Sequence, residues 1–129
     1  MKKETQNWLK YASENLEVAR LSMANGYFNA CLQNTQQAAE KFLKAVLIEN
    51  DAGFKKTHSI FGLKNILAAG NFEVALSDDD CDFFDSIYIP SKYPVGNALP
   101  DFQPNQKICE QAISICEQLA INIHGQLTL

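Results

Sequence analysis

Arginine is almost absent from this chain of 129 residues, where Arg20 is the only one. Lysine and arginine together number 11 against 15 aspartates and glutamates, so the formal net charge is −4. An acidic molecule repels nucleic acid as a whole, and binding to nucleic acid would need a local basic patch. The scarcity of arginine also weighs against an extended phosphate-binding surface and against an active site that depends on arginine.

Long hydrophobic runs are also missing. No apolar stretch approaches the ~20 residues that a membrane-spanning helix needs. The chain opens with the charged residues MKKE and not with a signal peptide, so we expect a cytoplasmic protein. Hydrophobic residues make up 47% of the sequence, an ordinary share for a globular protein. A single domain over residues 1–129 is therefore expected.

Paired cysteines are missing as well. The four cysteines form no C-x-x-C motif and show no metal-ligand spacing with His58 or His124. Cys109 and Cys116 lie seven residues apart on one apolar helical face, so we interpret them as small core side chains. Neither a structural zinc site nor a disulfide framework is expected.

Acidic residues cluster in one segment, at Asp78, Asp79, Asp80, Asp82 and Asp85. Such a cluster can hold a divalent cation, but an acidic first turn is also what a helix dipole favours. We favour the second interpretation. Ser77 is expected to cap this helix, with Asp80 three residues further on as a variant capping box. No metal and no cofactor are predicted.

Helical periodicity dominates the chain, and no strand pair or hairpin turn is recognisable. The apolar spacing predicts helices over about residues 5–25, 27–50, 57 or 59 to 70, from Ser77 onward, and 105–125. Five helices with short connections predict an all-α fold, an up-and-down bundle of four to five helices.

The second predicted helix is apolar over most of its circumference, so it should be the central helix and can also meet a second subunit. Its narrow polar stripe comprises Gln33, Asn34, Gln37, Glu40, Lys41 and Lys44. If this stripe faces a groove, Gln37, Lys41 and Lys44 can line a nucleotide cleft, with lysine meeting phosphate. The alternative is a solvated face with the i,i+4 pairs Gln37/Lys41 and Glu40/Lys44.

A basic turn precedes the third predicted helix, where Lys55 and Lys56 are followed by Thr57-His58-Ser59. Hydroxyl and N–H groups at a helix start form a potential anion site, so Lys56, Thr57 and His58 are candidate ligand-binding residues. The simpler interpretation is structural: Thr57 or Ser59 caps the helix, and His58 bonds a neighbouring backbone group. We assign no catalytic residue.

All four prolines fall between residues 90 and 104. This stretch is predicted to be an ordered loop or a lid, because Tyr93, Leu99 and Phe102 can anchor it. Lys92 and Tyr93 are candidate ligand contacts, with the tyrosine stacking on a base and the lysine meeting a phosphate. Alternatively, the aromatic side chain simply pins the loop to the bundle.

Several different short segments, spread over most of the chain, form a recognisable combination. It consists of Trp8, Gly26-Tyr27 with Ala30, Gln36-Gln37-Ala38-Ala39-Glu40-Lys41 with Lys44-Ala45, Thr57-His58-Ser59 with Leu63, and Tyr88 with Lys92-Tyr93-Pro94. In this combination the chain resembles the HEPN family, small helical proteins of bacteria and archaea, over nearly its whole length.

The resemblance implies a four- or five-helix bundle that usually forms a homodimer. Family members often accompany a minimal nucleotidyltransferase, frequently as a toxin–antitoxin pair. Many are ribonucleases that use an arginine followed four to six residues later by a histidine. Here His58 is the first histidine after Arg20, and no arginine precedes His124 within that range. Lys92 also stands where the family usually has arginine.

The leading prediction is thus a non-catalytic, HEPN-like homodimeric module that binds a nucleotide or phosphate ligand and partners a nucleotidyltransferase. The alternative is a HEPN ribonuclease toxin with an atypical active site, in which His58 or His124 acts as acid–base and lysines replace arginine. A third possibility is a dimerisation scaffold alone. RNA is a partner only in the ribonuclease alternative.

Overall fold

The computed structural model describes residues 1–52, 57–92 and 103–128, with only the backbone described for residues 88–92. These residues form five helices and no strand, which confirms the predicted all-α bundle. The helices are α1 (Lys3–Ala24), α2 (Phe28–Glu49), α3 (Ile60–Ala69), α4 (Asp78–Lys92) and α5 (Gln106–Leu127).

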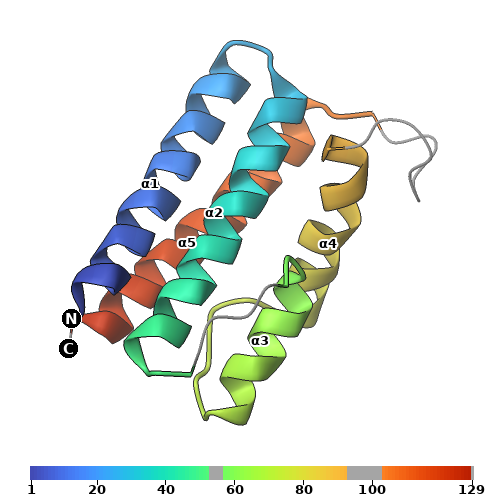
Figure 1. The fold of residues 1–129 in the computed structure, drawn as a ribbon. Coiled ribbons are helices and arrows are strands. Elements are labelled where there is room, and N and C mark those ends of the chain that lie inside the picture. Colours follow the sequence, from blue (N-terminus) through green and yellow to red (C-terminus); the bar gives the residue numbers. More distant parts are fainter. Residues whose placement is uncertain (53–56, 93–102, 129) are drawn as a thin grey trace.

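Helix α2 lies at the centre of the bundle. Three long helices, α1, α2 and α5, run side by side (Figure 1). The shorter helices α3 and α4 lie on the side of α2 that faces away from α1. Helix α2 contacts each of the other four helices. Its side chains are buried around most of its circumference, as its single narrow polar stripe predicted. The prediction that this helix is central is confirmed.

The helix ends follow from local chemistry. Gly26 has φ +79°, a left-handed conformation that glycine adopts without steric cost, and the chain turns there from α1 into α2. Ser77 and Asp80 form the predicted capping box: the Asp80 N–H donates to Ser77 Oγ, and the Ser77 N–H donates to Asp80 Oδ2, both at 3.0 Å. Asn105 caps α5 through the Ile108 N–H, at 2.9 Å.

The proline-rich stretch predicted as a loop begins inside a helix, and the last helix extends beyond its predicted end at about Gly125. Helix α4 continues through Pro90 to Lys92, and α5 continues through Gly125 to Leu127. Proline fixes φ near the helical value, so near a helix end it costs mainly one backbone hydrogen bond. Gly125 does not adopt the left-handed conformation with which glycine commonly ends a helix. The rest of the predicted proline loop, through Phe102, lies outside the described residues.

Across the described ranges, none of the five helices combines the length and the apolar character that crossing a membrane requires.

We predict that Gly125→Ala stabilises the protein by about 0.5–1 kcal/mol, because alanine loses less backbone entropy than glycine in a helix. An added Cβ at Gly125 would meet no atom within 4 Å. Gly26→Ala is the matched control, and its positive φ should make it destabilising by about 1 kcal/mol. Urea unfolding measures both values, and a loss of stability in Gly125→Ala would contradict the helical assignment of this residue.

Candidate functional site

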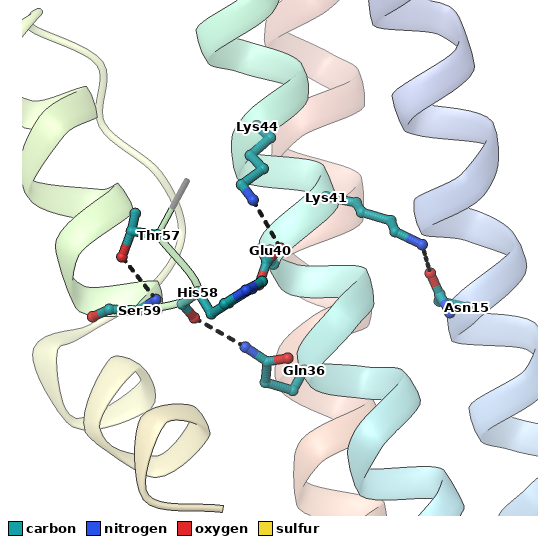
Figure 2. Close-up of polar contacts among 8 residues, drawn as sticks. All are labelled: Asn15, Gln36, Glu40, Lys41, Lys44, Thr57, His58 and Ser59. Carbon is teal, nitrogen blue, oxygen red and sulfur yellow. Dashed lines mark hydrogen bonds and ion pairs between the residues drawn. The ribbon is translucent and has the colours of Figure 1, made fainter. Parts of the chain in front are cut away.

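Glu40 joins two cationic side chains beside the turn that leads into α3. Its Oε2 accepts a hydrogen bond from Lys44 Nζ at 2.9 Å, and its Oε1 lies 2.9 Å from His58 Nδ1 (Figure 2). A carboxylate only accepts hydrogen bonds, so this contact places a proton on His58 Nδ1. The Lys44 and Glu40 side chains are only 5% and 12% exposed, whereas His58 is 60% exposed. The Glu40–Lys44 ion pair is therefore buried, and the His58 imidazole faces outward.

The predicted Glu40/Lys44 ion pair is confirmed, but the solvated-face interpretation is wrong for these two residues. Lys44 is almost fully buried. A buried lysine is tolerated when a carboxylate lies within hydrogen-bonding distance. Glu40 therefore neutralises a buried charge and orients His58 at the same time.

The turn before α3 is fastened to α2 and caps its own helix. Gln36 Nε2 donates to the His58 carbonyl at 3.1 Å. The Ser59 N–H donates to Thr57 Oγ1 at 3.2 Å, and Ser59 Oγ accepts from the Gly62 N–H at 3.0 Å. The structural interpretation of Ser59 as the α3 cap is thus confirmed. Thr57 instead accepts a hydrogen bond within the turn, from the Ser59 N–H.

Asp85 on α4 already fills the anion position at the start of α3. Its carboxylate accepts from the Ile60 N–H at 2.8 Å, the Phe61 N–H at 3.2 Å and the Ser59 hydroxyl at 3.1 Å. Sequence reasoning missed this role by grouping Asp85 with the acidic first turn of its helix. The available signal was its position: Asp85 lies two turns into α4, where the helix dipole no longer accounts for an acidic residue.

The side chains of the polar stripe on α2 do not all face the same site. Lys41 Nζ donates to Asn15 Oδ1 of α1 at 2.6 Å, whereas Lys44 bonds Glu40 on the α3 side (Figure 2). Gln37 is exposed. The structure therefore brings Lys44, Thr57 and His58 into one neighbourhood and directs Lys41 toward another.

Three further predicted ligand residues cannot be placed with them. Lys56 and Tyr93 lie outside the described residues. Lys92 ends α4, but only its backbone is described.

Arg20 and His124 both have structural surroundings. Arg20 donates to Glu17 at 3.0 Å and to Glu117 of α5 at 2.9 Å, and the Glu117 hydrogen bond raises the pKa of this guanidinium. Its charge is therefore used to join α1 and α5. The His124 ring contacts Phe42 edge-on, with ring centres 6.0 Å apart. This contact fits the interpretation of His124 as a structural residue.

The cysteines are buried thiols in the core. Desolvation raises the pKa of Cys31 and of Cys116 to about 12, and that of Cys81 to about 11. These thiols stay protonated at neutral pH and are poor nucleophiles. Among the described side chains, no group of three or more His, Cys, Asp or Glu residues is arranged to hold a metal ion.

Comparison with known proteins gives a family and a fold. The family model described as "HEPN domain" matches residues 5–121. A solved structure described as ST0689, an archaeal HEPN homologue, is 26% identical, with a TM-score of 0.72 and 98% of each chain covered. The structure of TT1696 from Thermus thermophilus is 24% identical, with a TM-score of 0.75, covering 96% of this chain and 98% of that one. No curated protein matches.

We predict that Asp85→Ala lowers the free energy of unfolding by about 2–3 kcal/mol, because α3 loses the carboxylate that accepts from its first N–H groups. Asp82→Ala is the matched control, since Asp82 is exposed on the same helix; it should change stability by no more than about 0.5 kcal/mol. Urea unfolding measures both variants. Equal losses would contradict the clamping role of Asp85.

We also predict that Glu40→Ala costs about 3 kcal/mol, because it leaves the buried Lys44 ammonium without its carboxylate. The double variant Glu40→Leu/Lys44→Met removes both charges and should regain most of that loss. Denaturant unfolding of the two variants provides the comparison. A double variant less stable than Glu40→Ala would show that the ion pair is not the source of the effect.

Proposed function

The chain belongs to the HEPN domain family, and from this premise we propose that it is a non-catalytic helical module that binds a nucleotide or another phosphate ligand. The module acts as a homodimer in the cytoplasm and partners a minimal nucleotidyltransferase in a toxin–antitoxin-like pair.

The exposure and the fixed orientation of the His58 ring are the observation that best supports ligand binding. Its ring is 60% exposed, yet Glu40 holds its Nδ1 atom at 2.9 Å and so fixes its orientation. When both of its ring nitrogens are protonated, this oriented, exposed ring can donate its Nε2–H to a phosphate oxygen. Lys55 and Lys56 directly precede this turn in the sequence and add positive charge.

The phosphate is expected at the imidazole and not at the α3 N-terminus. Asp85 accepts from the Ile60 and Phe61 N–H groups and from Ser59, so an incoming anion there would meet a carboxylate. Two negative charges that close together repel each other strongly. The ligand therefore lies on the outer side of the turn.

A non-catalytic role is supported by the use of the single arginine. No histidine follows Arg20 within four to six residues, and the guanidinium is bound to Glu17 and Glu117. The cation that would stabilise a phosphoryl transition state is thus engaged between α1 and α5.

Exposed apolar side chains support assembly with other chains. Val18 and Leu21 on α1 are 38% and 57% exposed, and Ile121 on α5 is 68% exposed. We propose that these three side chains contact another chain, because contiguous exposed apolar surface marks protein contacts.

A thermal-shift titration with mononucleotides tests the binding proposal. We expect a stabilisation of ~1–3 kcal/mol at saturating ligand, and we expect His58→Ala to abolish it. Lys10→Ala, an exposed charge removal on α1, is the matched control and should leave binding unchanged. No stabilisation by any nucleotide or by inorganic phosphate would overturn the proposal.

One observation favours a second function, ribonuclease activity. The Glu40–His58 contact of 2.9 Å resembles the carboxylate–histidine pairs that orient a general acid–base. Labelled RNA incubated with the purified protein in the absence of any partner tests it. Cleavage that disappears in His58→Ala or His124→Ala, with the helical circular-dichroism signal retained, would establish an enzyme. Intact RNA over a range of substrates would exclude it.

A further inference from the structure

An apolar strip runs along the outer side of α1. This helix packs on α2 and α5 and lies at the edge of the bundle (Figure 1). Tyr11, Val18 and Leu21 form the strip, and all three side chains are exposed. Tyr11 and Val18 are about two helical turns apart and Leu21 follows about one turn later, so they share one side of the helix. This strip lies outside the core and leaves apolar surface for another chain.

A hollow continues the apolar strip toward α2. It has a volume of about 340 Å³ and is lined by Glu4, Asn7, Trp8, Tyr11 and Lys41. Almost all of its exposed surface is apolar, so the two aromatic rings and the methylene stem of Lys41 form its walls. The Lys41 ammonium donates to Asn15 at 2.6 Å, and Glu4 is exposed at one end of the hollow. The hollow therefore suits an apolar side chain, which it would remove from water.

The charges beside the apolar strip change sign along α1. Lys10 is exposed on one flank of the strip, and Glu14 and Glu17 follow on the same flank nearer the C-terminal end. Glu17 Oε2 accepts from Arg20 at 3.0 Å, and a carboxylate has further acceptor capacity. A second α1 that runs antiparallel brings lysine against glutamate, whereas a parallel one brings Lys10 against its own copy. Charge complementarity therefore favours an antiparallel copy of this helix.

We propose that a second copy of this chain covers the apolar strip, with the two α1 helices antiparallel about a two-fold axis. The inference rests on the homodimer proposed above and gives that homodimer its interface.

The hollow and the charges select the same register of the two helices. Along α1 the hollow extends from Glu4 to Tyr11. When Val18 of the second copy lies over its middle, Leu21 of that copy lies over the end near Glu4. In this register Lys10 lies level with the interval between Glu14 and Glu17 of the second copy. The two-fold axis repeats each of these contacts, so every substitution acts twice.

Sedimentation velocity of the full chain over a dilution series measures the dimer. Val18→Glu and Leu21→Glu each bring a carboxylate to the apolar hollow, so each should raise the dimer dissociation constant by roughly tenfold or more. Tyr27→Glu is the matched control, because Tyr27 is exposed at the turn between α1 and α2, outside the strip, and its substitution should have no effect. Trp8 is the only tryptophan, so a red shift of its emission on dilution reports that the hollow is uncovered.

A charge exchange tests the antiparallel register. Lys10→Glu sets two carboxylates against each other across the interface, and Glu14→Lys sets two ammonium groups against each other. Each variant alone should dimerise roughly tenfold more weakly. A mixture of the two variants should restore the dimer, because each introduced charge then meets an opposite one. Lys10 and Glu14 are also neighbours on one helix, and only the mixture separates contacts between copies from contacts within one copy.

Three results would overturn the inference. If the chain dimerises but only Ile121→Glu on α5 weakens the dimer, the homodimer of the proposed function stands and its interface lies elsewhere. If the wild type is monomeric at every concentration, the homodimer and this interface both fail. If Val18→Glu dissociates the dimer but the mixture of charge variants does not restore it, the antiparallel register is wrong. Circular dichroism confirms that each variant is folded.

Discussion

Four other helices pack around α2, so its polar side chains need hydrogen-bond or ion-pair partners within the bundle. A buried charge without a partner is costly, so the ammonium of Lys44 needs a carboxylate inside the bundle. Glu40, one turn earlier on the same helix, supplies it at 2.9 Å. The second oxygen of that carboxylate then fixes His58. The position of the exposed imidazole thus depends on the neutralisation of a charge in the interior.

The same constraint divides the polar residues of α2 between two faces. On one side, Lys41 and Asn34 bond the amide of Asn15 on α1, at 2.6 and 2.9 Å. On the other, Gln36 and Glu40 hold the turn that precedes α3. The polar residues of α2 therefore serve two neighbours, α1 on one side and the turn before α3 on the other.

Much of the fold was predictable because it depends on local rules. Apolar spacing located the five helices, and the Ser77–Asp80 spacing located a cap that the structure confirms. The direction in which long side chains turn was not predictable. Lys41 and Lys44 share a stripe by sequence, yet tertiary partners draw them apart. The role of Asp85 was also hidden, because it arises from a contact 25 residues away along the chain.

Asp85 also affects how the molecule can open. Helix α3 has only 10 residues, too few to be stable alone in water, and its first amides are bound by a side chain of α4. The two helices therefore form one hydrogen-bonded unit, and each of them also packs on α2. The His58 turn belongs to that unit through Ser59 while its ring is held by α2. Local unfolding of α3 and α4 would consequently release the imidazole from Glu40, and occupancy at the turn would slow amide exchange throughout both helices.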